Sequence, residues 1–230
     1  MIRKPSKKMI LALPKGRLLS DIESLLARAD IHPETAFYDH DGRQFRFTTN
    51  IPDLDIIRVR AFDVATFVAF GVAQIGIVGL DVLLEFEYPE IYMPLDLNIG
   101  HCRLSLAKHK GSNTTLQEGQ LHTSISIATK YPQLTKRYCA QRNVRTECIK
   151  LNGAVELAIN LGLCECIVDL VSTGSTLKKN DLVEVETIAH VTSRLIVNRN
   201  ALKTNHDSLD ALMERFEKAT PHHNAIEHTA

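Results

Sequence analysis

Short apolar runs alternate with segments of helical periodicity along most of the chain, and this alternation limits the folds open to it. The apolar run at residues 9–13 precedes leucine and isoleucine residues, between 18 and 26, that recur on one helix face. Further strands are predicted at residues 55–60, 73–78, 103–107, 124–128, 148–151, 166–170 and 194–197. Further helices are predicted at residues 62–70, 80–84, 132–141, 154–161 and 208–218. The pattern predicts an α/β fold with largely parallel sheets.

Length, charge and hydropathy agree with such a fold and exclude other classes of protein. The 230 residues are enough for one large domain or two small lobes, and 44% of them are hydrophobic, which allows a buried core. The 27 basic residues balance the 27 acidic ones, which argues against a nucleic-acid-coating protein. There is no apolar stretch of about 18 residues that would predict a membrane span. The first apolar run is too short for a signal peptide, so we expect a cytoplasmic protein.

The segment 166–180 contains the strongest candidate for a ligand site. An apolar strand leads to Asp169, and a turn rich in Ser, Thr and Gly follows it. Such a turn can direct several backbone N–H groups and hydroxyls toward the oxygens of a phosphate. Gly174 lets the backbone approach closely or adopt a positive φ, and Asp169 is placed to accept hydrogen bonds from sugar hydroxyls. The alternative is an ordinary strand–turn–helix in which a Ser or Thr caps the helix.

A second candidate is the segment LPKGRL at residues 13–18. It places Gly16 between Lys15 and Arg17 at the end of a strand, where the two cations can form an anion site. Arginine is suited to bidentate binding of phosphate oxygens. Alternation along a strand puts Arg58 and Arg60 on the same face. Further arginines that could join the site are Arg43, Arg46, Arg58 and Arg60. The alternative is a turn with solvated charges.

Several segments between residues 11 and 198 carry a combined signature. They are LALPKGRL (11–18), RAFDVATFVAFGVAQIGIVGLDVLLE (60–85), LDLNIGHCRL (95–104), IATKYP (127–132), NGAVELA (152–158), IVDLVSTGSTLKKN (167–180) and SRLIVN (193–198). In this order they resemble the short form of ATP phosphoribosyltransferase, the HisG catalytic subunit of histidine biosynthesis. The resemblance implies two α/β lobes of type II periplasmic-binding-protein-like topology, with the active site in the cleft between them. It implies lobe I at 1–91 with 181–220, lobe II at 92–180, and a flexible tail at 221–230.

The resemblance also implies an activity and the residues that carry it. ATP condenses with phosphoribosyl pyrophosphate (PRPP) to give N1-(5-phospho-β-D-ribosyl)-ATP and pyrophosphate, the first step of L-histidine biosynthesis. Arg17 and Arg43 match arginines that reach the ATP and pyrophosphate groups. Weaker candidates for ATP binding are Lys15, Gly16 and Arg60. The implied PRPP-binding residues are Asp169, Leu170, Val171, Ser172, Thr173, Gly174, Ser175, Thr176 and Glu156, the last in contact with the sugar or a metal.

The implied chemistry needs little acid–base catalysis. The nucleophile, adenine N1, is a neutral lone pair, and the sequence contains no Ser/His/Asp triad, metal-binding His pair or GxGxxG loop. Charge builds on pyrophosphate as an oxocarbenium-like ribose forms, so Arg17, Arg43 and a Mg²⁺ carried by PRPP would stabilise the leaving group. The five cysteines lack zinc-ligand spacing and are expected to be reduced, so no metal site made by protein ligands is predicted.

Partners and departures complete the expectations from the resemblance. The chain leaves no room for the regulatory domain of long family members, so we expect a homodimer within a hetero-oligomer with a regulatory HisZ subunit, similar to histidyl-tRNA synthetase. The family differs from this chain at Gln74, Ile159, Glu165 and Asp181, and the change at Gln74 puts nucleotide contacts there in doubt. Other readings are a solute-binding or sensor module without turnover, another phosphoribosyltransferase, and an inactive paralogue.

Overall fold

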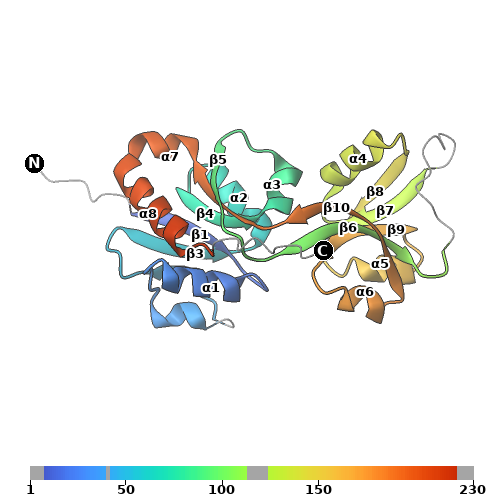
Figure 1. The fold of residues 1–230 in the computed structure, drawn as a ribbon, viewed down its shortest axis with the longest axis horizontal. Helices are drawn as coiled ribbons and strands as arrows, with labels where there is room; N and C mark the ends of the chain where they lie inside the picture. Colours follow the sequence, from blue (N-terminus) through green and yellow to red (C-terminus); the bar gives the residue numbers. More distant parts are fainter. Residues whose placement is uncertain (1–7, 40–41, 113–123, 222–230) are drawn as a thin grey trace, which may run out of the picture. The chain divides into compact units, whose positions relative to one another are not determined.

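The computed structural model describes residues 8–39, 42–112 and 124–221, and these residues form two compact units (Figure 1). The first unit comprises the described residues up to Leu83, Tyr88–Gly100 and those from Thr192 onward. The second comprises Leu84–Glu87 and His101–Val191. The chain therefore leaves the first unit and returns to it, so this unit is discontinuous in sequence.

The boundaries of the units differ from those expected at residues 91/92 and 180/181. Strand β5 (Ile91–Asp96) pairs with β11 (Ser193–Asn198) and so belongs to the first sheet. Strand β10 (Leu182–Val191) pairs along its length with β6 (Cys102–His109) and so belongs to the second. The divisions consequently fall after residues 100 and 191. Of the expected tail, residues 222–230 lie outside the described residues.

The first unit is built on a six-stranded sheet in the order β2-β3-β1-β4-β11-β5. At its centre, β1 (Met9–Pro14) is parallel to β3 (Leu54–Val59) and to β4 (Ile75–Gly79). β2 (Arg46–Thr48), β11 and β5 each pair antiparallel with their neighbours. The sheet is thus mixed, and the expectation of largely parallel sheets was wrong here. The cause is that the chain returns through β11 in the opposite direction to β4.

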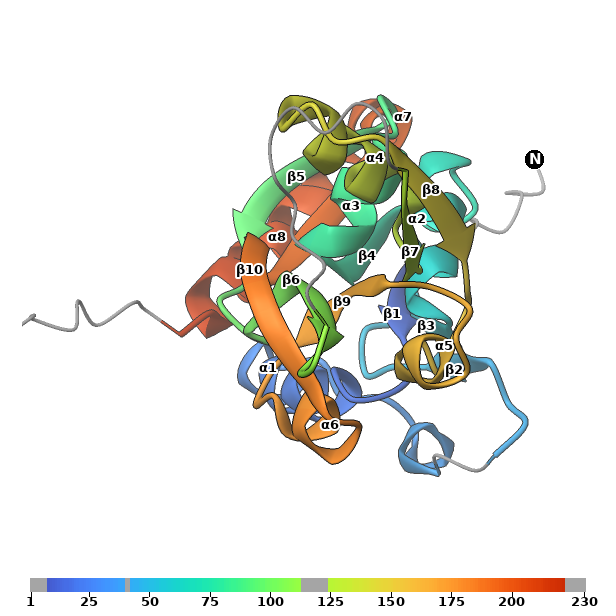
Figure 2. The ribbon, with the colours of Figure 1, turned by 90° about the vertical axis from the view of Figure 1, so that its right-hand side faces the viewer.

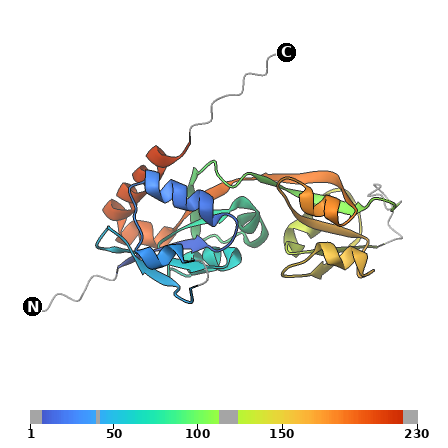
Figure 3. The same cartoon turned by 90° about the horizontal axis from the view of Figure 1, so that it is seen from below.

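Helices cover both faces of this sheet because apolar residues alternate along β1. Leu11 and Leu13 pack in one fully buried cluster with α1 (Leu19–Arg28) and α8 (His206–Ala219). Ile10 and Ala12 pack in another with α2 (Ala61–Ala69) and α3 (Leu80–Phe86). Figure 3 shows α1 in blue beside α8 in red, where Arg28 Nε donates to the Ala219 carbonyl at 2.8 Å. Burial on both faces explains why β1 is continuously apolar.

The remaining elements of the first unit are short and were not predicted. A 3₁₀ turn, η1, spans Thr35–Tyr38, and α7 spans Arg199–Thr204. The Asn198 side chain caps α7, since its Oδ1 accepts from the N–H groups of Asn200 and Ala201, both at 3.0 Å. This local capping begins a helix that carries little apolar periodicity of its own.

The second unit is built on a five-stranded sheet in the order β10-β6-β9-β7-β8, with β10 and β8 at its edges (Figure 2). β7 (Ile125–Thr129) is parallel to β8 (Thr146–Lys150) and to β9 (Cys166–Val171), whereas β6 is antiparallel to both β9 and β10. This sheet is also mixed. Helices α5 (Glu156–Asn160) and α6 (Ser175–Lys179) lie on one face and α4 (Pro132–Gln141) on the other (Figure 1).

None of the helices in the described part of the chain combines the length and the hydropathy needed to span a bilayer.

Candidate active site

The loop after β1 turns the chain directly into α1. Gly16 has φ 100°, a backbone conformation that is strained for any residue with a side chain. The Lys15 N–H donates to the Val59 carbonyl at 2.7 Å, and the Leu19 N–H donates to the Gly16 carbonyl at 2.9 Å. These bonds fix the loop at the carboxyl edge of the parallel strands β1 and β3. This edge of an α/β sheet is where ligands usually bind.

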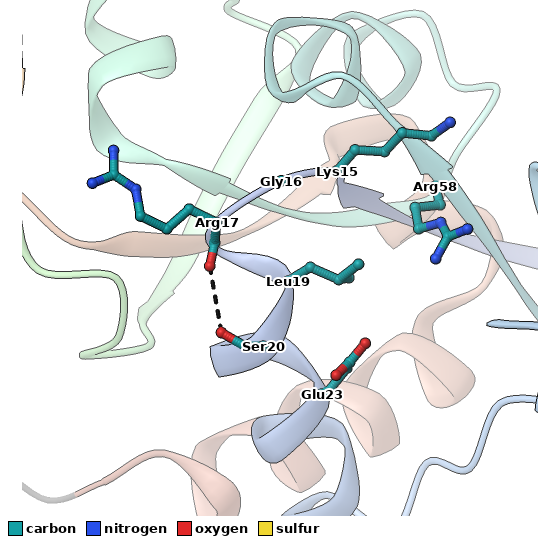
Figure 4. A pocket seen from close by; sticks show the side chains of 7 residues that line it. All are labelled: Lys15, Gly16, Arg17, Leu19, Ser20, Glu23 and Arg58. Carbon is teal, nitrogen blue, oxygen red and sulfur yellow. Dashed lines mark hydrogen bonds between the residues drawn. The ribbon is translucent and has the colours of Figure 1, made fainter. Parts of the chain in front are cut away.

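A pocket of about 410 Å³ opens at this loop. Figure 4 shows the Arg17 and Lys15 side chains pointing to opposite sides of Gly16, with Arg58 of β3 on the same side as Lys15. Both Lys15 and Arg17 are exposed. The pocket is lined by Lys15, Gly16, Arg17, Leu19, Ser20, Glu23 and Arg58. The predicted cationic loop therefore borders a cavity of the first unit.

Arg58 and Arg60, which alternation along a strand predicts on the same face, differ in burial. β3 ends at Val59, and Arg60 is the exposed residue that precedes α2. Arg58 is 1% exposed, and its guanidinium donates to the carbonyls of Phe37 at 2.7 Å and Asp39 at 2.8 Å. Arg58 is consequently a structural residue that holds the segment leading to Arg43.

Arg43 is exposed in the irregular segment before β2. Two residues later, the Phe45 ring lies 4.3 Å from Lys15 Nζ, a cation–π contact that brings this segment to the loop after β1. Arg46, in contrast, pairs with the buried Asp55, with Nη2 and Oδ2 2.7 Å apart. Lys8 and Arg46 hold the pKa of Asp55 below its usual value against the opposing effect of its burial. Arg46 is thus engaged in the fold, and Arg43 remains the candidate for ligand contact.

In the second unit, β9 ends at Val171 and a three-residue turn leads into α6. Gly174 has φ 76°, in agreement with the positive φ that the sequence allowed. Thr173 Oγ1 accepts from the Ser175 N–H at 3.4 Å and donates to Ser175 Oγ at 3.1 Å. The hydroxyl side chains of the turn are exposed, namely Ser172, Thr173, Ser175 and Thr176. They are therefore accessible to a ligand.

The strand residues before the turn are less accessible. Val171 is buried in a core cluster with α5 and α6, so only its backbone can face a ligand. Asp169 and Leu170 are half-buried at the end of β9, and Asp169 lies opposite Ser105 of β6 in the register. Glu156 is half-buried at the first position of α5, which packs against β9. The structure thus places all the predicted PRPP-binding residues within the second unit.

An ion pair that sequence reasoning missed lies beside this turn. Arg103 Nε and Nη2 donate to the two carboxylate oxygens of Glu184 at 2.6 and 2.5 Å, and Nη1 donates to the Ser172 carbonyl at 3.2 Å. Glu184 also accepts from Ser105 Oγ at 2.7 Å and from Thr187 Oγ1 at 3.2 Å. The bond from Arg103 is the main cause that lowers the pKa of Glu184 to about 2. No sequence signal marks a pair separated by 81 residues.

Two departures from the family pattern have structural roles. Gln74 lies before β4, where its Oε1 accepts from the Ile10 N–H at 2.9 Å and its Nε2 donates to the Gly71 carbonyl at 3.2 Å. It stands at the opposite end of the parallel strands from Gly16. Glu165 Oε2 accepts from the Ser126 N–H at 3.0 Å. Both side chains are thus engaged in fixing strand ends.

The cysteines and acids place limits on other chemistry. The five cysteines form no disulfide among the described residues, and burial raises the pKa of Cys139 to about 11 and that of Cys166 to about 12. These two thiols are neutral near pH 7 and are poor nucleophiles. Within the described residues, no three His, Cys, Asp or Glu side chains are grouped so that they could hold a metal ion.

Comparison with known proteins gives one consistent result. The family described as "HisG: ATP phosphoribosyltransferase" matches residues 60–218. An ATP phosphoribosyltransferase of Paramagnetospirillum magneticum is 57% identical over 94% of this chain and 98% of the relative. One from Rhodospirillum rubrum is 56% identical over 94% of this chain and 95% of the relative.

A solved structure agrees with these relatives. The ATP phosphoribosyl transferase (HisG:HisZ) complex from Thermotoga maritima contains a chain that is 32% identical to this one, with a TM-score of 0.77. The likeness covers 92% of this chain and 98% of that one. It bears out the predicted type II periplasmic-binding-protein-like fold. The chain therefore belongs to the ATP phosphoribosyltransferase family.

Proposed function

We propose that the chain performs the family's reaction with two groups of residues, one in each unit. ATP phosphoribosyltransferase condenses ATP with PRPP to N1-(5-phospho-β-D-ribosyl)-ATP and pyrophosphate, and this is the first step of histidine biosynthesis. The observation that carries the proposal is the turn after β9, where accessible hydroxyls surround a glycine with positive φ. The units are proposed to act as the two substrate-binding lobes.

The turn after β9 is proposed to bind PRPP. The hydroxyls and N–H groups from Ser172 to Thr176 would hold the 5′-phosphate, because a turn of this kind offers several donors to one anion. Asp169, at the strand end, would accept from the ribose hydroxyls. Leu170 and Val171 would contribute through their backbone. Glu156 is the acid that would contact the ribose or a metal ion.

The loop after β1 is proposed to bind the nucleotide and the leaving group. Arg17 and Arg43 would stabilise the charge that develops on pyrophosphate, as fixed cations do in many transferases. Lys15, Gly16 and Arg60 are weaker candidates for ATP contact. Arg17, Arg43 and Arg60 are exposed and form no ion pair among the described residues, which supports their assignment to ligand binding.

Enzymes with these phosphorylated substrates generally need a divalent metal ion, and we propose Mg²⁺. Magnesium usually keeps several waters and binds substrate phosphates with one or two carboxylates, so it needs no cage of protein ligands. Asp169 and Glu156, the acids assigned to the ribose or a metal ion, are of the type that such shared coordination uses. When bound, the ion neutralises charge on the pyrophosphate group.

Adenine N1 is a neutral nucleophile, so the chain's residues need to orient the substrates rather than remove a proton. Holding two reactants in line converts a bimolecular reaction into an effectively unimolecular one. The experiment is to mix the protein with Mg²⁺, ATP and PRPP, and to add a pyrophosphatase that pulls the reaction forward. Appearance of the adduct absorbance supports the proposal. Binding of either substrate without turnover would favour a solute-binding or sensor module.

A regulatory subunit of the HisZ type is proposed as partner, because the Thermotoga maritima relative is part of a HisG:HisZ complex. We propose a homodimer of this chain within that hetero-oligomer, in the cytoplasm, where ATP and PRPP are made. Size-exclusion chromatography with and without a HisZ subunit tests the assembly. An isolated chain that histidine inhibits strongly would contradict the proposal, since feedback is expected to pass through the partner.

A further inference from the structure

The turn after β9 is anchored by a guanidinium that belongs to a different strand. Arg103 lies on β6, opposite Val171 in the register, and it reaches past the end of β9 to the carbonyl of Ser172. The carbonyl is the first one beyond the strand, so the sheet ladder no longer holds it. Arg103 therefore fixes the backbone of the turn at Ser172, as the hydrogen bonds of the sheet fix the backbone of β9.

The fork of the guanidinium makes two contacts possible at once. Its Nε and Nη2 edge is occupied by the Glu184 carboxylate, at 2.6 and 2.5 Å, and this leaves Nη1 aimed at Ser172. The bidentate contact fixes the plane of the guanidinium as well as its position. A lysine ammonium could not reproduce this, because it is a point charge on a flexible stem.

Glu184 is itself held rigidly. Ser105 is only 1% exposed. Its Oγ and Thr187 Oγ1 both donate to the same carboxylate oxygen of Glu184, at 2.7 and 3.2 Å. The side chains of Arg103 and Glu184 are 33% and 24% exposed, so water screens the pair only in part. This pair is thus a preorganised support, unlike a mobile surface ion pair.

The orientation of one peptide follows from this support. In a trans peptide the C=O and the next N–H point in opposite directions. With the Ser172 carbonyl turned toward Arg103, the Thr173 N–H is turned away from it. Within the described residues, the Thr173 N–H makes no hydrogen bond, so it remains available as a donor.

We infer that Arg103, held in plane by Glu184, is a positioning residue for PRPP that orients the Ser172–Thr173 peptide toward the 5′-phosphate. The inference rests on the proposed role of the turn. Arg103 is not proposed to touch the substrate, and it acts through the backbone of the turn. Its loss should therefore weaken PRPP binding and leave the ATP site in the other unit unaffected.

The test is steady-state kinetics of the full chain, with PRPP and ATP varied separately. Arg103→Gln should raise the KM for PRPP about tenfold, as expected for one hydrogen bond from a charged group, with less than about a twofold change for ATP. Glu184→Gln should act in the same direction. Arg103→Lys should raise the KM for PRPP as Arg103→Gln does, because an ammonium group cannot contact Glu184 through two nitrogens and Ser172 through a third.

A matched control is available in the same unit. Arg142 pairs with Glu186, which lies two residues beyond Glu184 on β10, and within the described residues neither side chain is hydrogen-bonded to the turn after β9. Arg142→Gln also breaks an arginine–glutamate pair but should leave the KM for PRPP unchanged. Melting temperatures of all variants separate a general loss of stability from the specific effect.

Each outcome decides the inference. An unchanged KM for PRPP in Arg103→Gln overturns it, and so does full recovery in Arg103→Lys, which would mean that charge alone matters. If Arg103→Gln does not fold, the same comparison is made with Arg103→Lys and Glu184→Gln, which keep the size of the side chains. A wild-type chain without adduct formation would refute the proposed function instead, so the two failures are distinguishable.

Discussion

Single cationic residues in the first unit divide into ligand candidates and structural anchors. Arg58 and Arg60 illustrate the division, since they are two positions apart and differ completely in burial. The guanidinium of Arg58 donates to two backbone carbonyls, whereas Arg60 is exposed. The type of residue alone is thus a poor guide to an anion site, and hydrogen-bond partners decide it.

Replacement of Arg17 tests the leaving-group role. Arg17→Ala should lower turnover about tenfold or more, because loss of one preorganised donor typically costs about 2–4 kcal/mol of barrier. The exposed Arg145, in the second unit, serves as control for the loss of one positive charge. Steady-state turnover equal to that of wild type would remove Arg17 from the mechanism.

Replacement of Arg58 tests the anchoring role. Arg58→Ala should reduce the free energy of unfolding by about 2–4 kcal/mol, since it leaves the carbonyls of Phe37 and Asp39 without their charged donor. Urea titration measures this, and Arg60→Ala should change stability by less than about 0.5 kcal/mol as an exposed control. Similar stabilities for both variants would contradict the anchoring role.

At the scale of elements, the sequence indicated those whose signals are local. β1 and β9 are apolar runs that end in Gly-containing turns, and both were predicted with their loops. β5 was missed because it contains Pro94 and exposed residues, which are typical of an edge strand. β10 was missed because most of its residues are half-buried and two register shifts interrupt its pairing with β6, so apolar and polar positions do not alternate along its whole length.

The candidate site was predictable to the same extent. The residues of the turn from Ser172 to Thr176 are contiguous, so their composition alone made them a candidate phosphate site, with a helix-capping turn as the alternative. The pairing of Arg103 with Glu184 depends on the antiparallel return of β10 against β6, which no local pattern reveals. The burial of Arg58 likewise depends on contacts with a distant segment, at Phe37 and Asp39.

The turn after β9 makes a prediction at this scale. Gly174→Ala meets no clash, since the nearest atom to an added Cβ is Val171 Cγ1 at 3.9 Å, but φ 76° is unfavourable for alanine. Such a substitution should cost about 1–2 kcal/mol of stability and should raise the KM for PRPP. Gly153→Ala, where an added Cβ meets nothing within 4 Å, is the control. Equal KM values for the two variants would contradict a binding role for the turn.

At the scale of the whole molecule, the ion pair beside the turn gives stability a dependence on pH. Arg103 holds the pKa of Glu184 at about 2, below its ordinary value of 4.5. A depressed pKa contributes stability that is present above the ordinary value and is lost as the pH falls toward 2. Glu184 therefore supports the fold at neutral pH and contributes to acid unfolding.

Glu184→Gln tests this contribution. Wild type should lose more free energy of unfolding than the variant between pH 5 and about 2, because only wild type has this carboxylate to protonate. Urea titrations at several pH values measure the difference. Parallel stability curves for the two proteins over that range would show that Glu184 is not held by Arg103 in solution.

In the proposed function, the sugar and the leaving group are bound by different units of the chain. This division depends above all on the proposed binding of the 5′-phosphate of PRPP by the turn from Ser172 to Thr176. Calorimetric titration of PRPP into wild type and into Thr173→Ala and Thr176→Ala tests it most directly. We expect weaker PRPP binding in both variants with unchanged ATP binding, whereas PRPP affinities equal to that of wild type would show that these hydroxyls do not bind the phosphate.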